Sequence, residues 1–183
     1  QDGNSVGIFQ FESQGMTNFM KELKPDCLED IIAGVSLYRP GPMDQIPRYI
    51  ANKKDPEHAV YTHPALKPIL KVTYGCMVYQ EQVMQIVRDL AGYSLGRADL
   101  VRRAMGKKKL DVMAREREIF INGQLDEDGN IVVPGCVRNG IDAESANRIF
   151  DEMADFAKYA FNKSHAAAYA VVSYRTAYLK AYY

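Results

Sequence analysis

The sequence predicts a mainly α-helical fold, an irregular multi-helix domain with minor β-structure. Apolar residues recur along most of the chain at the i, i+3, i+4 and i+7 spacing of an amphipathic helix, whereas alternating stretches are few and short. Proline, glycine and potential capping residues interrupt the helical pattern repeatedly. A chain of 183 residues is long enough to bury a real core, and its length suggests one domain, with or without an appended subdomain.

The first part of the chain predicts two short helices after an extended entry. Residues 6–12 alternate weakly between apolar and polar side chains and are expected to be extended. Ser13 is expected to cap a helix that Pro25 ends. Asp26 with Glu29 resembles a capping box, which would start the next helix.

The middle of the chain alternates between rigid turns and helices. Two prolines in Arg39–Pro42 predict a rigid corner that carries Arg39, and residues 46–54 predict a short helix. His63–Pro64 is expected to start a helical turn, with the histidine as a boundary residue rather than a catalyst. Residues 72–79 predict a short strand, and 80–91 a helix.

The stretch from Ser94 to Lys109 contains six basic residues and one acidic residue. It predicts a helix that Ser94 caps and Gly106 ends. The apolar arc of this helix would comprise Ala98, Leu100, Val101, Ala104 and Met105. Arg102 and Arg103 lie outside that arc, and Lys107, Lys108 and Lys109 follow where cations complement the helix macrodipole. Taken alone, such a run is most often a solvated face.

The last third predicts a turn and two more helices. Asp126–Asn130 reads as a tight turn before a brief extended piece, and Asp142 is expected to cap a helix. The final helix, from His165 on, would place His165 and Tyr169 on one face. Its start could offer donors to an anion, together with Lys163 and Ser164 at that end. The alternative for His165 is a core histidine beside a packed tyrosine.

Composition narrows the classes of function. Lys plus Arg and Asp plus Glu both number 23, so net charge gives no general argument for nucleic-acid binding. Cys27, Cys76 and Cys136 lie far apart without a CxxC pair, which favours reduced cytoplasmic thiols over a disulfide framework or zinc site. We find no signal peptide and no apolar run of membrane-spanning length, so no membrane partner is expected. The start at Gln1 and the helical pattern at Tyr183 suggest a piece of a longer polypeptide.

Catalytic motifs are missing from the sequence. There is no Ser-His-Asp order, no Cys with its own base and no Walker lysine loop. Two-metal chemistry needs clustered carboxylates, and the only dense acidic group is the turn that begins at Asp126. We therefore expect no catalytic residue and no metal ligand within this chain.

Five segments carry a family resemblance and occur in a fixed order. They are Val6–Met16, Leu37–Pro42, Tyr79–Met84, Leu100–Lys109 and Phe161–Tyr169. Together they resemble the alpha subunit of bacterial DNA polymerase III, a replicative polymerase of the C family. The resemblance covers nearly the whole chain and corresponds to the fingers domain, so we expect residues 1–183 to be a fingers-domain fragment of a larger polymerase chain.

The resemblance implies template-directed DNA synthesis from deoxynucleoside triphosphates on a primer–template. The expected partners are these nucleotides, the primer–template DNA, the remaining polymerase domains and the replisome subunits. Two Mg²⁺ ions would be held by aspartates of a palm domain outside this chain. We expect the incoming nucleotide to contact Arg102, Arg103, Tyr159, Ser164, His165 and Tyr169. We expect nucleic-acid or other phosphates to contact Arg39, Lys107, Lys108, Lys109 and Lys163.

Two departures from the family pattern stand out. Lys158 and Ala160 flank Tyr159 where glycines are common, and residues 122–140 are longer than in many relatives, which suggests a surface insertion. Two alternatives stay open. One is an error-prone alpha subunit of the C family, and the other is a non-catalytic helical module that binds nucleic acid or a phosphorylated partner.

Overall fold

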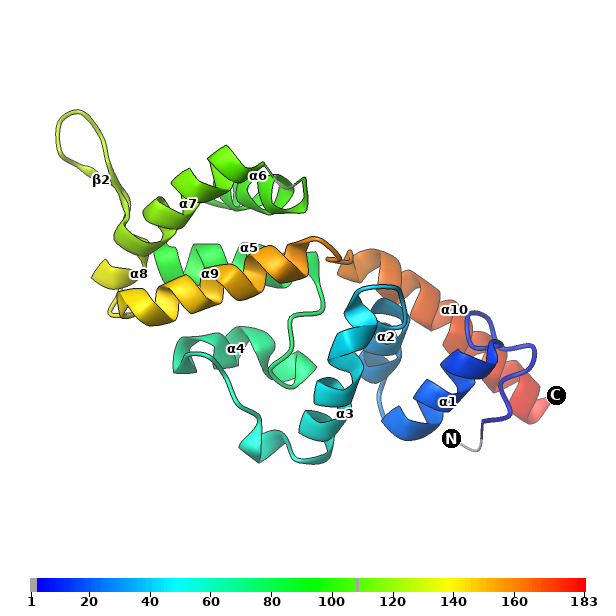
Figure 1. The fold of residues 1–183 in the computed structure, drawn as a ribbon. Coiled ribbons are helices and arrows are strands. Elements are labelled where there is room, and N and C mark those ends of the chain that lie inside the picture. The colour runs from blue at the N-terminus through cyan, green and yellow to red at the C-terminus, as the bar shows by residue number, and fades with distance from the viewer. Residues whose placement is uncertain (1–2, 108) are drawn as a thin grey trace. The chain divides into compact units, whose positions relative to one another are not determined.

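The computed structural model describes residues 3–107 and 109–183. These residues form ten α-helices, four 3₁₀-helices and one two-stranded antiparallel sheet (Figure 1). The predicted fold class, mainly α with minor β-structure, is therefore confirmed. The chain divides into two compact units, which are residues 1–58 with 161–183 (unit 1) and residues 59–160 (unit 2). Among the helices of the described residues, none combines the length and the apolar character that crossing a bilayer would require.

Unit 1 is built around the contact between a short helix and the long final helix. Its elements are α1 (Gln14–Leu23), α2 (Leu28–Leu37), η1 (Pro42–Gln45), α3 (Ile46–Lys54), η2 (Pro56–His58) and α10 (Lys163–Tyr182). Helix α10 packs along α2, as Figure 1 shows. The predicted Ser13 cap is confirmed, because its hydroxyl accepts a hydrogen bond from the Met16 N–H at 3.3 Å. The predicted corner is also present, with Gly41 at a φ of 100° and a bond from the Met43 N–H to the Arg39 carbonyl.

Two expectations for unit 1 are wrong. Residues 6–10 form turns and a bend rather than an extended segment, and Gln10 has a φ of 69°. The capping box is also incorrect, because α2 has Cys27 at its N-cap. Asp30 accepts a hydrogen bond from the Asp26 N–H at 3.1 Å, and Lys53 lies 3.0 Å from both carboxylates. Ion pairing with α3 therefore organises this helix start.

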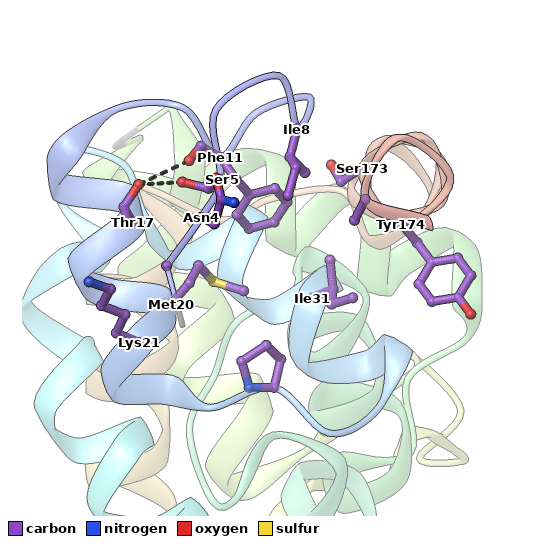
Figure 2. Close-up of a pocket in the computed structure, with 13 residues that line it drawn as sticks. Asn4, Ser5, Ile8, Phe11, Thr17, Met20, Lys21, Ile31, Ser173 and Tyr174 are labelled. Carbon is purple, nitrogen blue, oxygen red and sulfur yellow. Dashed lines mark hydrogen bonds between the residues drawn. The ribbon is translucent and has the colours of Figure 1, made fainter. Parts of the chain in front are cut away.

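An apolar cavity of about 160 Å³ lies under the N-terminal loop of unit 1. Figure 2 shows Ile8 and Phe11 of the loop facing Ile31, with Met20 closing one side. The Thr17 hydroxyl donates to the Phe11 carbonyl at 3.2 Å and pairs with the Ser5 hydroxyl at 2.6 Å, as the dashed lines in Figure 2 mark. These bonds hold the loop on α1.

Unit 2 is a helical core with a small hairpin. Its elements are η3 (Pro64–Leu66), α4 (Lys67–Leu70), η4 (Lys71–Thr73), α5 (Gln80–Ala91), α6 (Leu95–Gly106), α7 (Leu110–Asn122), β1 (Gln124–Leu125), β2 (Ile131–Val133), α8 (Gly135–Arg138) and α9 (Ala143–Ala157). Helix α5 packs against α6 and also contacts α7, α8 and α9. The buried rings of Phe120 and Phe150 join α7 to α9 with their centroids 5.7 Å apart.

Most local predictions for unit 2 are confirmed. Ser94 caps α6 by accepting a bond from the Arg97 N–H at 3.3 Å, and the helix ends at Gly106. His63 accepts a bond from the Ala65 N–H at 3.2 Å, which makes it a boundary residue of η3. Of the predicted apolar arc of α6, however, Leu100 is 65% exposed.

The strand predicted for residues 72–79 is wrong. The structure has η4 followed by an irregular segment, which the buried side chain of Gln82 organises. Its Oε1 accepts hydrogen bonds from the Val78 N–H at 2.8 Å and the Tyr79 N–H at 2.9 Å, and its Nε2 donates to the Thr73 hydroxyl at 2.8 Å. The side chain thus satisfies backbone donors that a neighbouring strand would otherwise satisfy.

The hairpin in segment 122–140 follows the predicted turn. The Asp126 carboxylate accepts bonds from the Asp128 N–H at 3.0 Å and the Asn130 N–H at 2.8 Å, and β1 pairs with β2 in an antiparallel arrangement. Asp142 caps α9, as predicted, through the Ser145 N–H at 2.8 Å. That this segment is a surface insertion stays a prediction.

Candidate functional site

The predicted site residues are distributed over both units. Unit 2 contains Arg102, Arg103, Tyr159, Lys107 and Lys109, and unit 1 contains Arg39, Lys163, Ser164, His165 and Tyr169. Lys108 lies outside the described residues.

A single carboxylate joins the two arginines of α6. Asp99 Oδ1 accepts hydrogen bonds from Arg102 Nε at 3.0 Å and Nη2 at 2.7 Å, while Oδ2 lies 2.7 Å from Arg103 Nε. Gln80, the first residue of α5, accepts a further bond from Arg102 Nη1 at 3.0 Å. The hydrogen bond from Arg102 is the main cause that lowers the pKa of Asp99, so the carboxylate is charged at neutral pH.

The two arginines differ in exposure. The Arg102 side chain is 23% exposed and the Arg103 side chain is 63% exposed. Arg102 is therefore held against α5, whereas Arg103 projects toward solvent with one edge fixed by Asp99. A partly buried, anchored arginine beside an exposed one suits a surface that meets an anion from solution.

Next to Arg103, helices α6 and α7 enclose an open cleft of about 380 Å³. Its cations are Arg103, Lys107 and Lys109, and its apolar lining includes Leu100 and Val112. This explains the exposure of Leu100, because the side chain lines the cleft rather than the core. Glu116 also lines the cleft, and its carboxylate pairs with Arg97 at 3.2 Å. Three cations at the end of a helix favour phosphate over a neutral ligand.

In unit 1, a groove of about 530 Å³ is lined by a row of aromatic rings. The Arg39 guanidinium lies over the Phe161 ring at 4.0 Å. The row continues from Phe161 to His165 with centroids 5.4 Å apart, from His165 to Tyr169 at 4.3 Å and from Tyr169 to Phe9 at 5.3 Å. Burial lowers the pKa of Arg39, but a guanidinium remains charged at neutral pH. The groove therefore combines flat apolar faces with a fixed cation.

His165 lies in the first turn of α10 and is exposed. Its backbone N–H donates to Asn162 Oδ1 at 2.9 Å, so Asn162 caps α10. The helix begins at Lys163, two residues before the predicted start at His165. The alternative of a core histidine is therefore wrong for this chain. Ser164 beside it is exposed, whereas Lys163 lies 3.0 Å from Glu29 of α2. Lys163 thus has a carboxylate partner already, which weakens its case as a phosphate ligand.

Tyr159 follows α9 at a turn. Its N–H donates to the Phe156 carbonyl at 2.9 Å, and its side chain is 49% exposed. Neighbouring Lys158 pairs with Asp155 at 2.6 Å, and this pairing raises the pKa of the lysine. The ring of Tyr159 is accessible on the surface of unit 2.

Comparison with known proteins decides the family. Residues 1–128 match the family described as the bacterial DNA polymerase III alpha subunit finger domain. The chain belongs to this family. It is 55% identical over 181 residues to the DNA polymerase III subunit alpha of Xylella fastidiosa, 54% identical to that of Chlamydia trachomatis and 49% identical over 182 residues to that of Borreliella burgdorferi.

These matches cover 99–100% of the chain but only 14–15% of each relative. The fingers domain described here therefore corresponds to a small part of those subunits. The predicted resemblance is confirmed, and it extends through α10, beyond the residues that the family match covers.

Sequence reasoning missed three residues that shape the surfaces of this fingers domain. Asp99 could have been found, because it precedes the arginines by three and four residues, a spacing that brings helical side chains together. Phe161 lies before the first residue of α10, so helical spacing does not point to its contact with His165. Gln80 is 22 residues from Arg102, and no local pattern points to their contact.

The fingers domain also brings together one group of three candidate metal ligands within its described residues. The ligating atoms of Asp26, Cys27 and Asp30 lie within 4.8 Å of one another. The Lys53 ammonium lies 3.0 Å from an oxygen of each carboxylate and offsets part of their charge. Its hydrogen bond to Asp26 is the main cause that lowers the pKa of that carboxyl group. We interpret the group as an ion-paired link between α2 and α3.

Proposed function

We propose that this fingers domain binds the incoming deoxynucleoside triphosphate and helps position primer–template DNA in a DNA polymerase III alpha subunit. The observation that carries the proposal is the pair of arginines on α6, which Asp99 orients beside a cleft lined by lysines. A triphosphate carries several negative charges. Its β- and γ-phosphates leave as pyrophosphate when the α-phosphate joins the primer. Fixed guanidinium groups stabilise that charge with forked, charge-assisted hydrogen bonds.

The groove of unit 1 would serve the sugar and base of the nucleotide. His165 and Tyr169 offer flat faces for stacking, and Arg39 adds a cation that can contact a phosphate. Tyr159 and Ser164, both exposed, complete the proposed nucleotide contacts. Lys107 and Lys109 are proposed to contact nucleic-acid phosphates, with Lys163 ranked below them because of its ion pair.

The chemistry itself would depend on residues outside this chain. Nucleotidyl transfer needs paired metal ions, which we propose to be Mg²⁺ held by carboxylates of another part of the subunit. The proposed partners are the remaining polymerase domains and the replisome subunits. We propose a cytoplasmic location, where the thiols of Cys27, Cys76 and Cys136 would stay reduced; all three are free in the structure.

The test is single-nucleotide incorporation by a full-length alpha subunit that contains this sequence. Arg102→Ala and Arg103→Ala should each slow incorporation by about 100-fold or more, because each removes a charge-assisted contact to the triphosphate. Arg88→Ala is the matched control, because Arg88 is an exposed arginine of α5 that pairs with the adjacent Asp89. Normal rates and normal nucleotide affinity in both variants would refute the proposal. Tight DNA binding without incorporation by the unmodified subunit would favour the non-catalytic binding module.

A further inference from the structure

We propose that Asp99 and Gln80 are positioning residues, which hold the guanidinium groups of the α6 arginines in the orientation that phosphate binding requires before the nucleotide arrives. The inference rests on the proposed function, because it needs Arg102 and Arg103 to be phosphate ligands. It goes beyond that function by assigning a role to two residues that do not contact the nucleotide.

The geometry makes Asp99 a shared anchor. Its two oxygens are divided between the arginines, with Oδ1 accepting from Arg102 at 3.0 and 2.7 Å and Oδ2 lying 2.7 Å from Arg103 Nε. Residues three and four apart on a helix are surface neighbours, so one carboxylate reaches both without distorting α6. The two guanidinium groups are therefore oriented relative to each other as well as to the helix.

Gln80 provides a second anchor from a different helix. Its side-chain oxygen accepts from Arg102 Nη1 at 3.0 Å. In the described part of the chain, the bonds to Asp99 and Gln80 use one hydrogen on each nitrogen of Arg102. Each Nη carries two hydrogens, so one on each remains for a ligand. These two hydrogens can donate to phosphate oxygens.

The anchor on α5 is itself fixed. Gln80 begins α5, and the buried Gln82 ties the segment before it through bonds to the Val78 and Tyr79 N–H groups and to the Thr73 hydroxyl. Helices α5 and α6 also pack against each other in the core of unit 2. A buried network therefore supports the position of Arg102.

This arrangement has two opposing effects on the affinity for the nucleotide. An unrestrained arginine loses side-chain rotamer entropy when a ligand fixes it, and anchoring removes part of that cost. The Asp99 carboxylate, however, reduces the net charge of the trio from +2 to +1, which weakens the attraction for a triphosphate. A positioning role should thus appear mainly in the rate of the chemical step, where orientation matters most.

The experiment measures single-turnover incorporation by a full-length alpha subunit over a range of nucleotide concentrations. Asp99→Asn should lower the maximal rate by about 10- to 100-fold, because misplaced ligands of the reacting group cost rates of this order. The apparent Kd for the nucleotide should stay the same or fall, since one negative charge is gone. Gln80→Met, which keeps the size of the side chain but removes the acceptor, should lower the rate by about 3- to 10-fold.

Asp89→Asn is the matched control, because it removes a carboxylate that pairs with an arginine elsewhere in unit 2, and its rate should not change. A double-mutant cycle supplies the second control. In an Arg102→Ala and Arg103→Ala background, Asp99→Asn should cause no further loss, because its effect acts through the arginines.

The outcomes separate the inference from the proposed function. If the arginine variants lose activity but Asp99→Asn and Gln80→Met keep full rates, the positioning role is overturned and the proposed function stands. An Asp99→Asn loss that persists in the arginine-free background would also overturn the positioning role. If the arginine variants themselves keep normal kinetics, the proposed function fails first.

Discussion

Replacement of Gln82 by methionine is expected to destabilise unit 2 by about 2–5 kcal/mol. Methionine keeps the size of the side chain but removes its hydrogen-bonding groups. The change leaves the buried N–H groups of Val78 and Tyr79 and the Thr73 hydroxyl without the bonds of 2.8–2.9 Å that Gln82 makes. Each buried N–H left unsatisfied costs about 1–3 kcal/mol, and the Thr73 hydroxyl keeps its bond to the Cys76 carbonyl.

The assay is urea unfolding of residues 1–183, which circular dichroism monitors. With a slope of about 2 kcal/mol per M, the expected loss lowers the midpoint of the unit 2 transition by about 1–2.5 M. Gln85→Met on the same helix is the matched control, because Gln85 is exposed and its replacement should change stability by less than about 0.5 kcal/mol. A loss below about 1 kcal/mol for Gln82→Met would refute the reasoning that this side chain replaces a strand partner.

Three further predictions follow from the same structure. The isolated chain should not extend a primed template with all four nucleotides and magnesium, because the metal-binding carboxylates are proposed to lie elsewhere; extension that survives repurification would contradict the division of roles. In a full-length subunit, His165→Ala should raise ribonucleotide incorporation if the exposed imidazole blocks the 2′-hydroxyl, whereas unchanged discrimination with a lower Tm would mean a structural role. The pKa of Asp99 is lowered from its ordinary value of 3.8, so its ion pairs stabilise the fold above that pH and lose this effect as the pH falls through the folded-state pKa. The stability difference between the wild type and Asp99→Asn, measured by urea unfolding, should accordingly be constant above about pH 5 and shrink below pH 3.8; a constant difference down to about pH 2 would argue against the ion pairs.

Helix starts were the most predictable features of the fold. Ser13, Ser94 and Asp142 each cap the helix that the sequence assigned to them, because the bond that defines a cap spans only three residues. The helix over 46–54 and that over 80–91 also begin and end where the periodicity places them. Local chemistry was sufficient for these elements.

The features that failed depend on side-chain contacts that periodicity does not specify. The apolar stretch over 72–79 has the composition of a strand, but the Gln82 side chain takes the backbone donors that would have formed a ladder. Leu100 has the right spacing for the core, yet it lines the cleft beside α7. Periodicity gives the face of a helix but does not say which neighbour covers it.

The candidate site was also only partly predictable from the sequence. Helical spacing placed Arg102 and Arg103 outside the apolar arc and His165 with Tyr169 on one face, but only the family resemblance gave them a role, which stays a prediction. The sequence did not reveal that one carboxylate orients both arginines or that Gln80 holds one of them, since the second contact joins two helices. The Lys163 prediction likewise overlooked Glu29, which is more than a hundred residues away in the sequence.

The most direct test of the central claim is a structure of a full-length alpha subunit that contains this sequence, with primer–template DNA, metal ions and a non-hydrolysable deoxynucleoside triphosphate. We expect the guanidinium nitrogens of Arg102 and Arg103 within about 3 Å of phosphate oxygens of the nucleotide, with the Asp99 bonds to both arginines retained. A triphosphate bound away from α6, with both arginines still turned to Asp99 and solvent, would contradict the account.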